Sequence, residues 1–188
     1  MLIQMLIQQP RMIGTVLAHT PTWVWFLLAG LLWLGIGMLR SKTISARRAA
    51  IMPVTMAGLS LWGTISAFGH SELYVHVLLT WAAAAMLLAT AVGSMPAPTG
   101  ASYSEQDRTF RVPGSWVPLV LILGMFLVKY LVGVEVTMNP ALPHDGSYSL
   151  TYGALYGVFS GIFAGRAIRL ARLAVRTSAP VSAPTARA

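Results

Sequence analysis

The segment that decides the fold is WVPLVLILGMFLVKYLVGVEV, residues 116–136, in which Lys129 and Glu135 are the only charged residues. A helix rises about 1.5 Å per residue, so about 20 apolar residues cross the ~30 Å hydrocarbon core of a bilayer. The segment shows no alternation of polar and apolar residues, which a membrane-spanning barrel strand would require. It therefore predicts a transmembrane helix.

Similar apolar segments recur along the chain and predict an all-α fold, a polytopic transmembrane helical bundle of about five spans. The expected spans are residues 23–39, 49–68, 73–92, 116–136 and 148–168. The composition agrees, because 56% of the 188 residues are hydrophobic and 10% are charged, whereas a soluble domain carries about a quarter charged residues. Pro53 is expected in the first turn of its helix, where its missing N–H costs little.

The spans form one expected domain, residues 22–176, between two short terminal segments. Residues 1–21 are expected to be extracytoplasmic or interfacial, because their apolar start is too short to span and lacks the pattern of a signal peptide. Met12 is an alternative start. Residues 177–188, rich in Ser, Ala and Pro, are expected to be a disordered cytoplasmic tail.

The basic residues predict the orientation of the bundle. Eleven of the thirteen fall in three regions that an odd number of spans places on one side: the connection after the first span, the long polar connection 94–115, and the C-terminal stretch. They are Arg40, Lys42, Arg47, Arg48, Arg108, Arg111, Arg166, Arg169, Arg172, Arg176 and Arg187. Because basic loops are retained in the cytoplasm, the predicted topology has the N-terminus out and the C-terminus in, in a bacterial inner membrane.

A row of glycines marks one face of the last span. Gly153, Gly157, Gly161 and Gly165 recur every fourth residue, which leaves that face without side chains. Helices in lipid associate by close packing, so such rows indicate a helix–helix contact. The contact could lie within the chain or between two copies, and a ligand path lined by backbone is the alternative.

Basic residues continue beyond the last span at helical spacing. Arg169, Arg172 and Arg176 would form a stripe at the cytoplasmic interface, where anionic lipid headgroups are the natural partner. A role as topology determinants alone also explains them. Nucleic acid is not expected as a partner, because the chain has no recognition module or compact basic domain.

Apart from Arg166, which lies at the end of the last predicted span, Lys129 is the only basic residue inside a predicted span, and it defines a candidate polar site. A charge at that depth costs a few kcal/mol on insertion scales, so it usually faces the bundle interior and has a partner. Glu135 and Glu72 are the candidate carboxylates, and Tyr152 and Tyr156 are expected at comparable depth. Three interpretations stay open: a structural ion pair, a solute or proton site in an outward-opening cavity, and a lysine that reaches the interface.

His70 and His76 flank the entrance of the third span and raise the question of a metal or haem. His76 lies four residues after Glu72, which favours a hydrogen-bonded pair over a metal site. No metal and no cofactor are expected. The six tryptophans mostly fall near predicted span ends, where indole rings prefer the interface, and they need no cofactor to explain them.

The opening His19-Thr20-Pro21-Thr22-Trp23-Val24-Trp25, followed by Pro53 and Gly58-Leu59-Ser60-Leu61-Trp62-Gly63, resembles a family of small bacterial inner-membrane proteins. That family is classed as a domain of unknown function. The resemblance covers roughly residues 12–175. It implies a polytopic membrane fold and brings no catalytic residues.

The sequence contains no recognisable catalytic motif, neither a phosphate-binding glycine loop nor a Ser/His/Asp or HExxH grouping, and no cysteine. The leading interpretation is a non-enzymatic membrane protein with a structural, regulatory or partner-subunit role. Its partners would be the bilayer and either a second copy or another membrane protein. The alternatives are a small proton- or solute-coupled transporter that uses the outer polar residues, and a redox subunit that binds haem or quinone.

Overall fold

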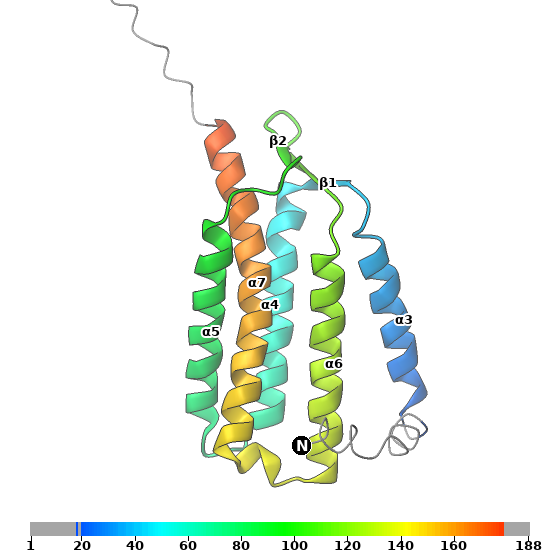
Figure 1. Ribbon diagram of the computed structural model, residues 1–188, viewed down its shortest axis with the longest axis vertical. Helices are drawn as coiled ribbons and strands as arrows, with labels where there is room; N and C mark the ends of the chain where they lie inside the picture. Colours follow the sequence, from blue (N-terminus) through cyan, green and yellow to red (C-terminus); the bar gives the residue numbers. More distant parts are fainter. Residues whose placement is uncertain (1–17, 19, 179–188) are drawn as a thin grey trace, which may run out of the picture.

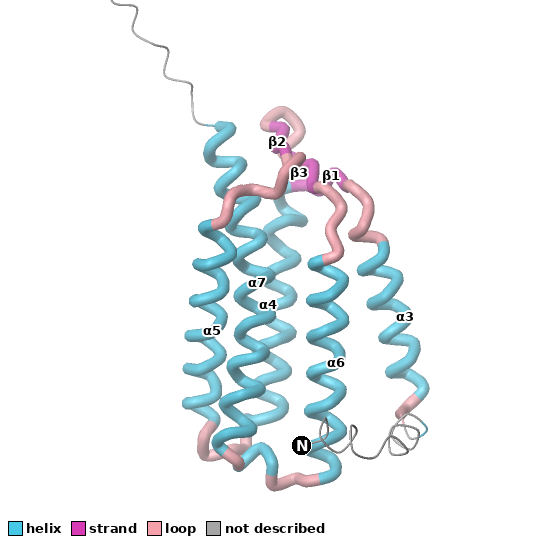
Figure 2. Tube along the Cα trace, in the orientation of Figure 1, coloured by secondary structure: helices cyan, strands magenta, loops and turns pink. Residues whose placement is uncertain are grey.

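The computed structural model describes residue 18 and residues 20–178, which form a mostly helical bundle capped by a small sheet (Figures 1 and 2). The helices are α3 (Thr22–Ile36), α4 (Ala46–Phe68), α5 (Tyr74–Ser94), α6 (Val117–Met138) and α7 (Gly146–Ser178). Each of the five predicted segments therefore holds one helix. The start at Met1 or Met12 and the tail beyond residue 178 lie outside the described residues.

Polar caps decide where two of the helices begin. The Ser45 hydroxyl accepts a hydrogen bond from the backbone N–H of Arg48 at 3.3 Å, which starts α4 three residues before the expected span. Pro53 therefore lies inside α4, and its predicted place in the first turn was wrong. In the same way, the Asp145 carboxylate accepts from the Tyr148 N–H at 2.9 Å at the start of α7.

Two of the predicted connections between spans contain strands, which were not predicted. β1 (Lys42–Ser45), β2 (Ser102–Ser104) and β3 (Thr109–Val112) form an antiparallel sheet in the order β1-β3-β2. Phe110 is buried in it, and its ring lies 4.8 Å from that of Tyr103 between centroids. The all-α expectation therefore holds for the bundle and fails for its cap, because short β-branched and aromatic stretches pair across two distant loops.

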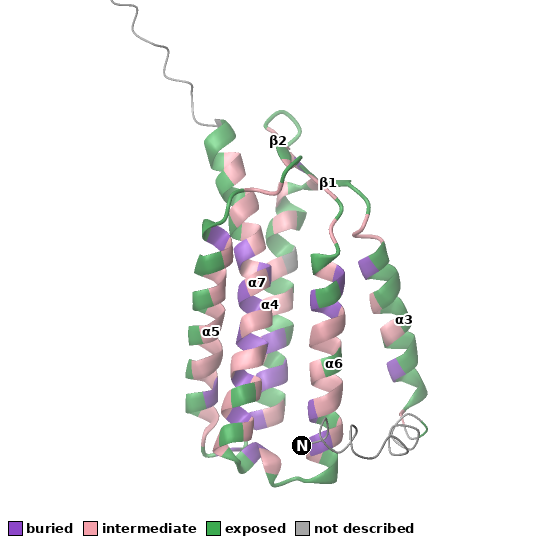
Figure 3. Cartoon of the chain, in the orientation of Figure 1, coloured by how far each residue is buried: buried purple, intermediate pink, exposed green. Residues whose placement is uncertain are grey.

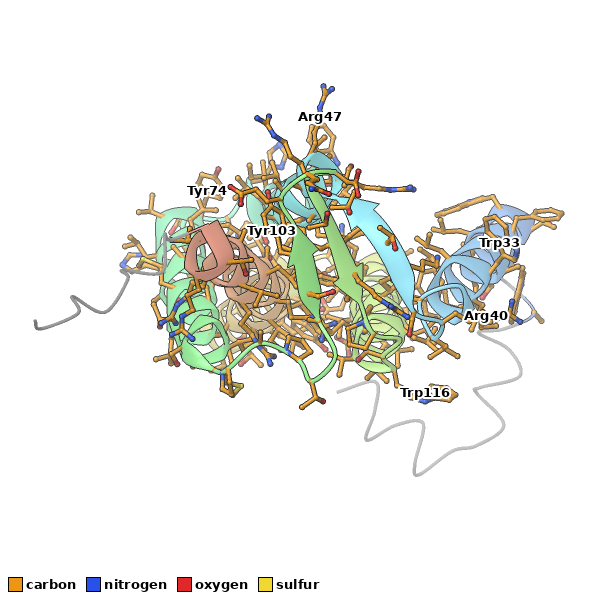
Figure 4. All side chains as sticks on the ribbon, turned by 90° about the horizontal axis from the view of Figure 1, so that it is seen from above. Trp33, Arg40, Arg47, Tyr74, Tyr103 and Trp116 are labelled. Carbon is orange, nitrogen blue, oxygen red and sulfur yellow. The ribbon has the colours of Figure 1, made fainter. Side chains whose placement is uncertain are left out.

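The sheet brings the three basic regions to one end of the bundle. β1 follows α3, β2 and β3 precede α6, and the C-terminal end of α7 reaches the same end (Figure 1). Figure 4 looks onto this end, with Arg40 and Arg47 projecting around the sheet. The turn between α4 and α5, with Glu72, lies at the opposite end together with the connection that holds Asp145.

The helices pack unevenly. α7 contacts α5 along most of its length and α4 to a smaller extent, whereas α6 packs mainly against α3 and makes few contacts with α4 and α7. One buried cluster joins Phe68, Val77, Val132 and Tyr156. The bundle therefore consists of a close-packed unit, α4–α5–α7, and a more loosely attached pair, α3–α6.

The outside of the bundle is apolar. Exposed residues cover the flanks of the helices in Figure 3. Many of the exposed side chains are large and apolar, such as Trp33, which is 80% exposed, and Val54, which is 72% exposed. A water-soluble protein rarely exposes such a continuous apolar surface. Within the described residues, α4, α5 and α6 are long and apolar enough to cross a membrane, while α3 is apolar but has only 15 residues. The 33-residue α7 is not in that set, and its exposed flank is reduced by its packing against α5 and α4.

Candidate functional site

The candidate site surrounds Lys129, near the middle of α6. Its side chain crosses to α4 and lies against Gly63, which is buried. A Cβ atom at Gly63 would overlap the ammonium group and lie 2.7 Å from Cε of the lysine. The absence of a side chain at this one position of α4 thus makes the room that Lys129 occupies.

Tyr156 on α7 forms another wall of the site. The Lys129 Nζ lies 6.0 Å from the centroid of its ring, at the outer limit of a cation–π contact. Tyr156 is 1% exposed, and its hydroxyl has no hydrogen-bond partner within the described part of the chain. Lys129 forms no ion pair there either, with Glu135 or with Glu72.

A pocket of about 320 Å³ opens beside these two side chains, between α4, α6 and α7. Its lining consists of Trp62, Gly63, Ser66, Ala67, Lys129, Val132, Gly133, Val136 and Tyr156. Four of these side chains can donate a hydrogen bond, and none carries a negative charge: Trp62, Ser66, Lys129 and Tyr156. The pocket is therefore positively polarised and otherwise apolar.

Glu135 belongs to a separate polar cluster one to two turns further along α6. Its carboxylate is 4% exposed and accepts a hydrogen bond from the Tyr152 hydroxyl at 3.2 Å. The buried Tyr148 hydroxyl lies beside the same carboxylate, and its ring is 4.6 Å from that of Tyr152 between centroids. The two predicted tyrosines therefore contact different groups. Tyr152 donates a hydrogen bond to the Glu135 carboxylate, and the ring of Tyr156 lies near the Lys129 ammonium group.

The other predicted polar residues lie apart from the pocket. His70, Glu72 and His76 are exposed where α4 turns into α5, and none of them lines the pocket around Lys129. Among the described residues, no three His, Cys, Asp or Glu side chains lie together as metal ligands would. The structure thus divides the sequence-predicted polar residues into two buried groups and one exposed turn.

A hydrogen-bond network in the core was not predicted from the sequence. Trp81 on α5 donates through Nε1 to the Ser60 hydroxyl at 3.1 Å, and Ser60 in turn donates to the Tyr156 backbone carbonyl at 3.2 Å. Ser160 donates to the same carbonyl at 3.0 Å. One sequence signal could have indicated this network. Ser60 and Trp81 lie in the middle of their predicted spans, where the preference of tryptophan for the membrane interface does not explain Trp81.

The glycine row of α7 faces α5. A Cβ atom at Gly157 would lie 2.9 Å from Cβ of Ala84, and one at Gly161 would lie 2.5 Å from the carbonyl oxygen of Ala85. The flanking positions Gly153 and Gly165 are equally crowded, by Val77 and Val92 respectively. The described structure thus uses this face as a seam inside the chain.

Two of the three arginines beyond the predicted last span bind the C-terminal end of α5. Arg169 donates from Nε at 3.0 Å, and also from Nη2, to the carbonyl oxygen of Pro96, and Arg172 donates to that of Gly93 at 2.8 Å. Helix C-termini carry unpaired carbonyls and partial negative charge, so the contact of Arg172 with Gly93, in the last turn of α5, is favourable. Pro96 lies two residues beyond that helix. Arg176 is exposed one turn further on.

A family model described as a family of unknown function (DUF6622) matches residues 1–182. The chain belongs to this family. The resemblance to a domain of unknown function is confirmed, but its extent was underestimated, because the DUF6622 match includes the eleven residues before Met12. No curated protein and no solved structure matches the chain.

Proposed function

We propose that this DUF6622 member is a multi-pass protein of a bacterial inner membrane, with five spans, the N-terminus out and the C-terminus in. One observation carries the proposal: the three basic regions meet at one end of a bundle whose flanks are apolar. Basic segments on a single end are typical of the cytoplasmic face of a membrane protein. Anionic lipid headgroups would meet this end, with Arg176 as the freely exposed member of the predicted stripe.

The proposal requires α3 and α7 to cross as well. Figure 1 places the two ends of α3 at opposite ends of the bundle, and α7 runs beside α5 for the length of that helix. The 15 residues of α3 span only about 22 Å, so its flanking residues would complete the crossing. The lower apolarity of α7 suits a helix that packs against α4 and α5 and meets lipid on a reduced flank.

The role supported best is non-enzymatic, as a structural or regulatory membrane component or as a subunit of a membrane assembly. The buried polar groups of the core, such as Ser60 and Trp81, are engaged in contacts that hold helices together. A small carrier is the second candidate, and a specific observation favours it. The pocket beside Lys129 lies where α6 meets the close-packed unit, and it places a half-buried cation beside an opening between helices.

Reporter fusions test the topology. A reporter active only in the cytoplasm should work when fused after residue 45, 105 or 180, and a periplasmic reporter should work after residue 70 or 143. Expression of each fusion is checked by immunoblotting against a tag. A cytoplasmic signal from residue 143 would contradict the five-span arrangement, because α6 or α7 would then fail to cross.

A further inference from the structure

The pocket beside Lys129 presents a cation without an anion. Its ammonium group makes no ion pair within the described residues, and the hydroxyls of Tyr156 and Ser66 have no hydrogen-bond partner there. Tyr156 is 1% exposed overall, and it lines the pocket beside Lys129. A ligand that accepts hydrogen bonds and carries one negative charge would complement the polar lining of this pocket, which holds one ammonium group and two hydroxyls.

The pocket opens on the side of the bundle. Trp62 and Ser66, on its rim, are exposed in the second half of α4, and Gly133 is exposed on α6. Trp62 is 72% exposed. Lys129 itself lies about 13 Å along the helix from Met138, the near end of α6. In the proposed membrane orientation, on which this inference rests, a ligand would therefore enter from the hydrocarbon and not from water.

We infer that the pocket binds the carboxylate head of a single-chain amphiphile, a long-chain fatty acid anion. The Lys129 ammonium pairs with the carboxylate and the Tyr156 hydroxyl donates to it. The acyl chain leaves the pocket past Val132, Val136 and the Trp62 indole, along the apolar flank between α4 and α6.

Charge and size both select this ligand. One ammonium group balances one carboxylate, and burial of the pair away from water strengthens their attraction. A volume of about 320 Å³ is at the small end of ligand pockets, so it holds a compact head but not the headgroup and two chains of a phospholipid. A quinone would satisfy the hydroxyls and leave the charge of Lys129 unbalanced.

The test uses the purified full chain in detergent micelles and reads the quenching of tryptophan fluorescence by dibromostearic acid. The bromine atoms quench an indole only at close range, and Trp62 lies on the path of the acyl chain. The matched control ligand is the dibrominated alcohol of the same chain length, which partitions similarly but carries no charge. Measurements are made near neutral pH, where carboxylic acids are ionised and lysine side chains are protonated.

The parent protein should show saturable quenching by the acid and at least about tenfold weaker quenching by the alcohol, the size expected for loss of one ion pair. Trp62→Phe should remove the saturable component. Lys129→Met should weaken binding about tenfold, and Lys129→Arg should retain most of it. Gly63→Ala, which places a methyl group where the ammonium lies, should also weaken binding, while Gly58→Ala, which faces open space, should not.

Several outcomes would overturn the inference. Equal quenching by acid and alcohol would show partition into the micelle only, and unchanged binding by both Lys129→Met and Gly63→Ala would remove the lysine from the site. Stronger competition by decylubiquinone than by unbrominated stearate would reassign the pocket to a quinone. The assay does not depend on topology, so a failed reporter experiment and a failed binding experiment are distinguishable.

Discussion

Tyr156 meets α6 through its side chain and α4 through its backbone: the Lys129 Nζ lies 6.0 Å from the centroid of its ring, and the Ser60 hydroxyl donates to its carbonyl at 3.2 Å. The backbone contact belongs to the close-packed unit α4–α5–α7, whereas the ring faces the loosely packed α6. A change in the position of α6 would therefore alter the pocket while the network behind Tyr156 stays intact.

Lys129→Met should leave the melting temperature in detergent unchanged or raise it. The substitution removes a half-buried charge that has no ion pair among the described residues, and it keeps the length of the side chain. Glu135→Gln should lower the melting temperature instead, because the Tyr152 hydroxyl loses a charged acceptor, at a cost of about 1.5–3 kcal/mol.

The double variant Lys129→Met with Glu135→Gln tests whether these two charges are coupled. Their effects on the free energy of unfolding should add to within about 0.5 kcal/mol, as for independent sites. A double variant that recovers most of the stability lost by Glu135→Gln would reveal an ion pair between the two residues.

Gly157→Leu and Gly161→Leu should strongly destabilise the bundle. Both positions touch the backbone and side chains of α5, so a leucine would force the two helices apart. Gly58→Leu and Gly133→Leu are the matched controls, because a Cβ atom at either position meets nothing within 4 Å. Thermal unfolding in detergent, followed by circular dichroism, should separate the two pairs. Similar melting temperatures for all four would show that α5 and α7 do not form a close seam.

Ser60→Ala should cost about 1–3 kcal/mol, because it leaves the Trp81 indole N–H without its acceptor inside the bundle. Trp81→Phe removes that donor, so the double variant should lose less stability than the sum of the single variants. Thr90→Ala serves as the control, since its hydroxyl bonds only within α5 and is exposed. Strict additivity of Ser60→Ala and Trp81→Phe would contradict the network.

Arg172→Gln should increase hydrogen exchange at the C-terminal turn of α5, which Arg172 binds through the Gly93 carbonyl. Arg169→Gln should act in the same direction through Pro96. Arg176→Gln has no such contact and should leave the exchange unchanged. If all three variants exchange like the parent in that turn, the two arginines do not hold the end of α5.

The positions of α4, α5 and α6 could be predicted from the sequence because each is an apolar run long enough to cross a membrane. The run at residues 116–136 coincides with α6 to within two residues at each end. Boundaries were less accurate where a cap decides them, as at Ser45, because capping is a contact of one side chain and leaves no periodic pattern.

The candidate site was only partly predictable. The occurrence of Lys129 inside an apolar run predicted a buried polar site, and Tyr156 was expected near it. The gap at Gly63 could not be predicted, because it depends on how α4 and α6 are rotated against each other. Among the described residues, Lys129 has no ion pair, although Glu135 lies six residues further along the same helix.

The length of each apolar segment and the positions of the charged residues are properties of the chain itself. The sequence alone was therefore enough to predict the helical segments, the grouping of the basic regions and the glycine-lined face of α7. The tertiary structure decided which groups meet. The pairing of β1 with β3 and the hydrogen bonds from Arg169 and Arg172 join residues whose proximity depends on the packing of whole helices. Hydrogen bonds and ion pairs require contact within a few ångströms, and distances of that scale between remote segments exist only once the helices have packed.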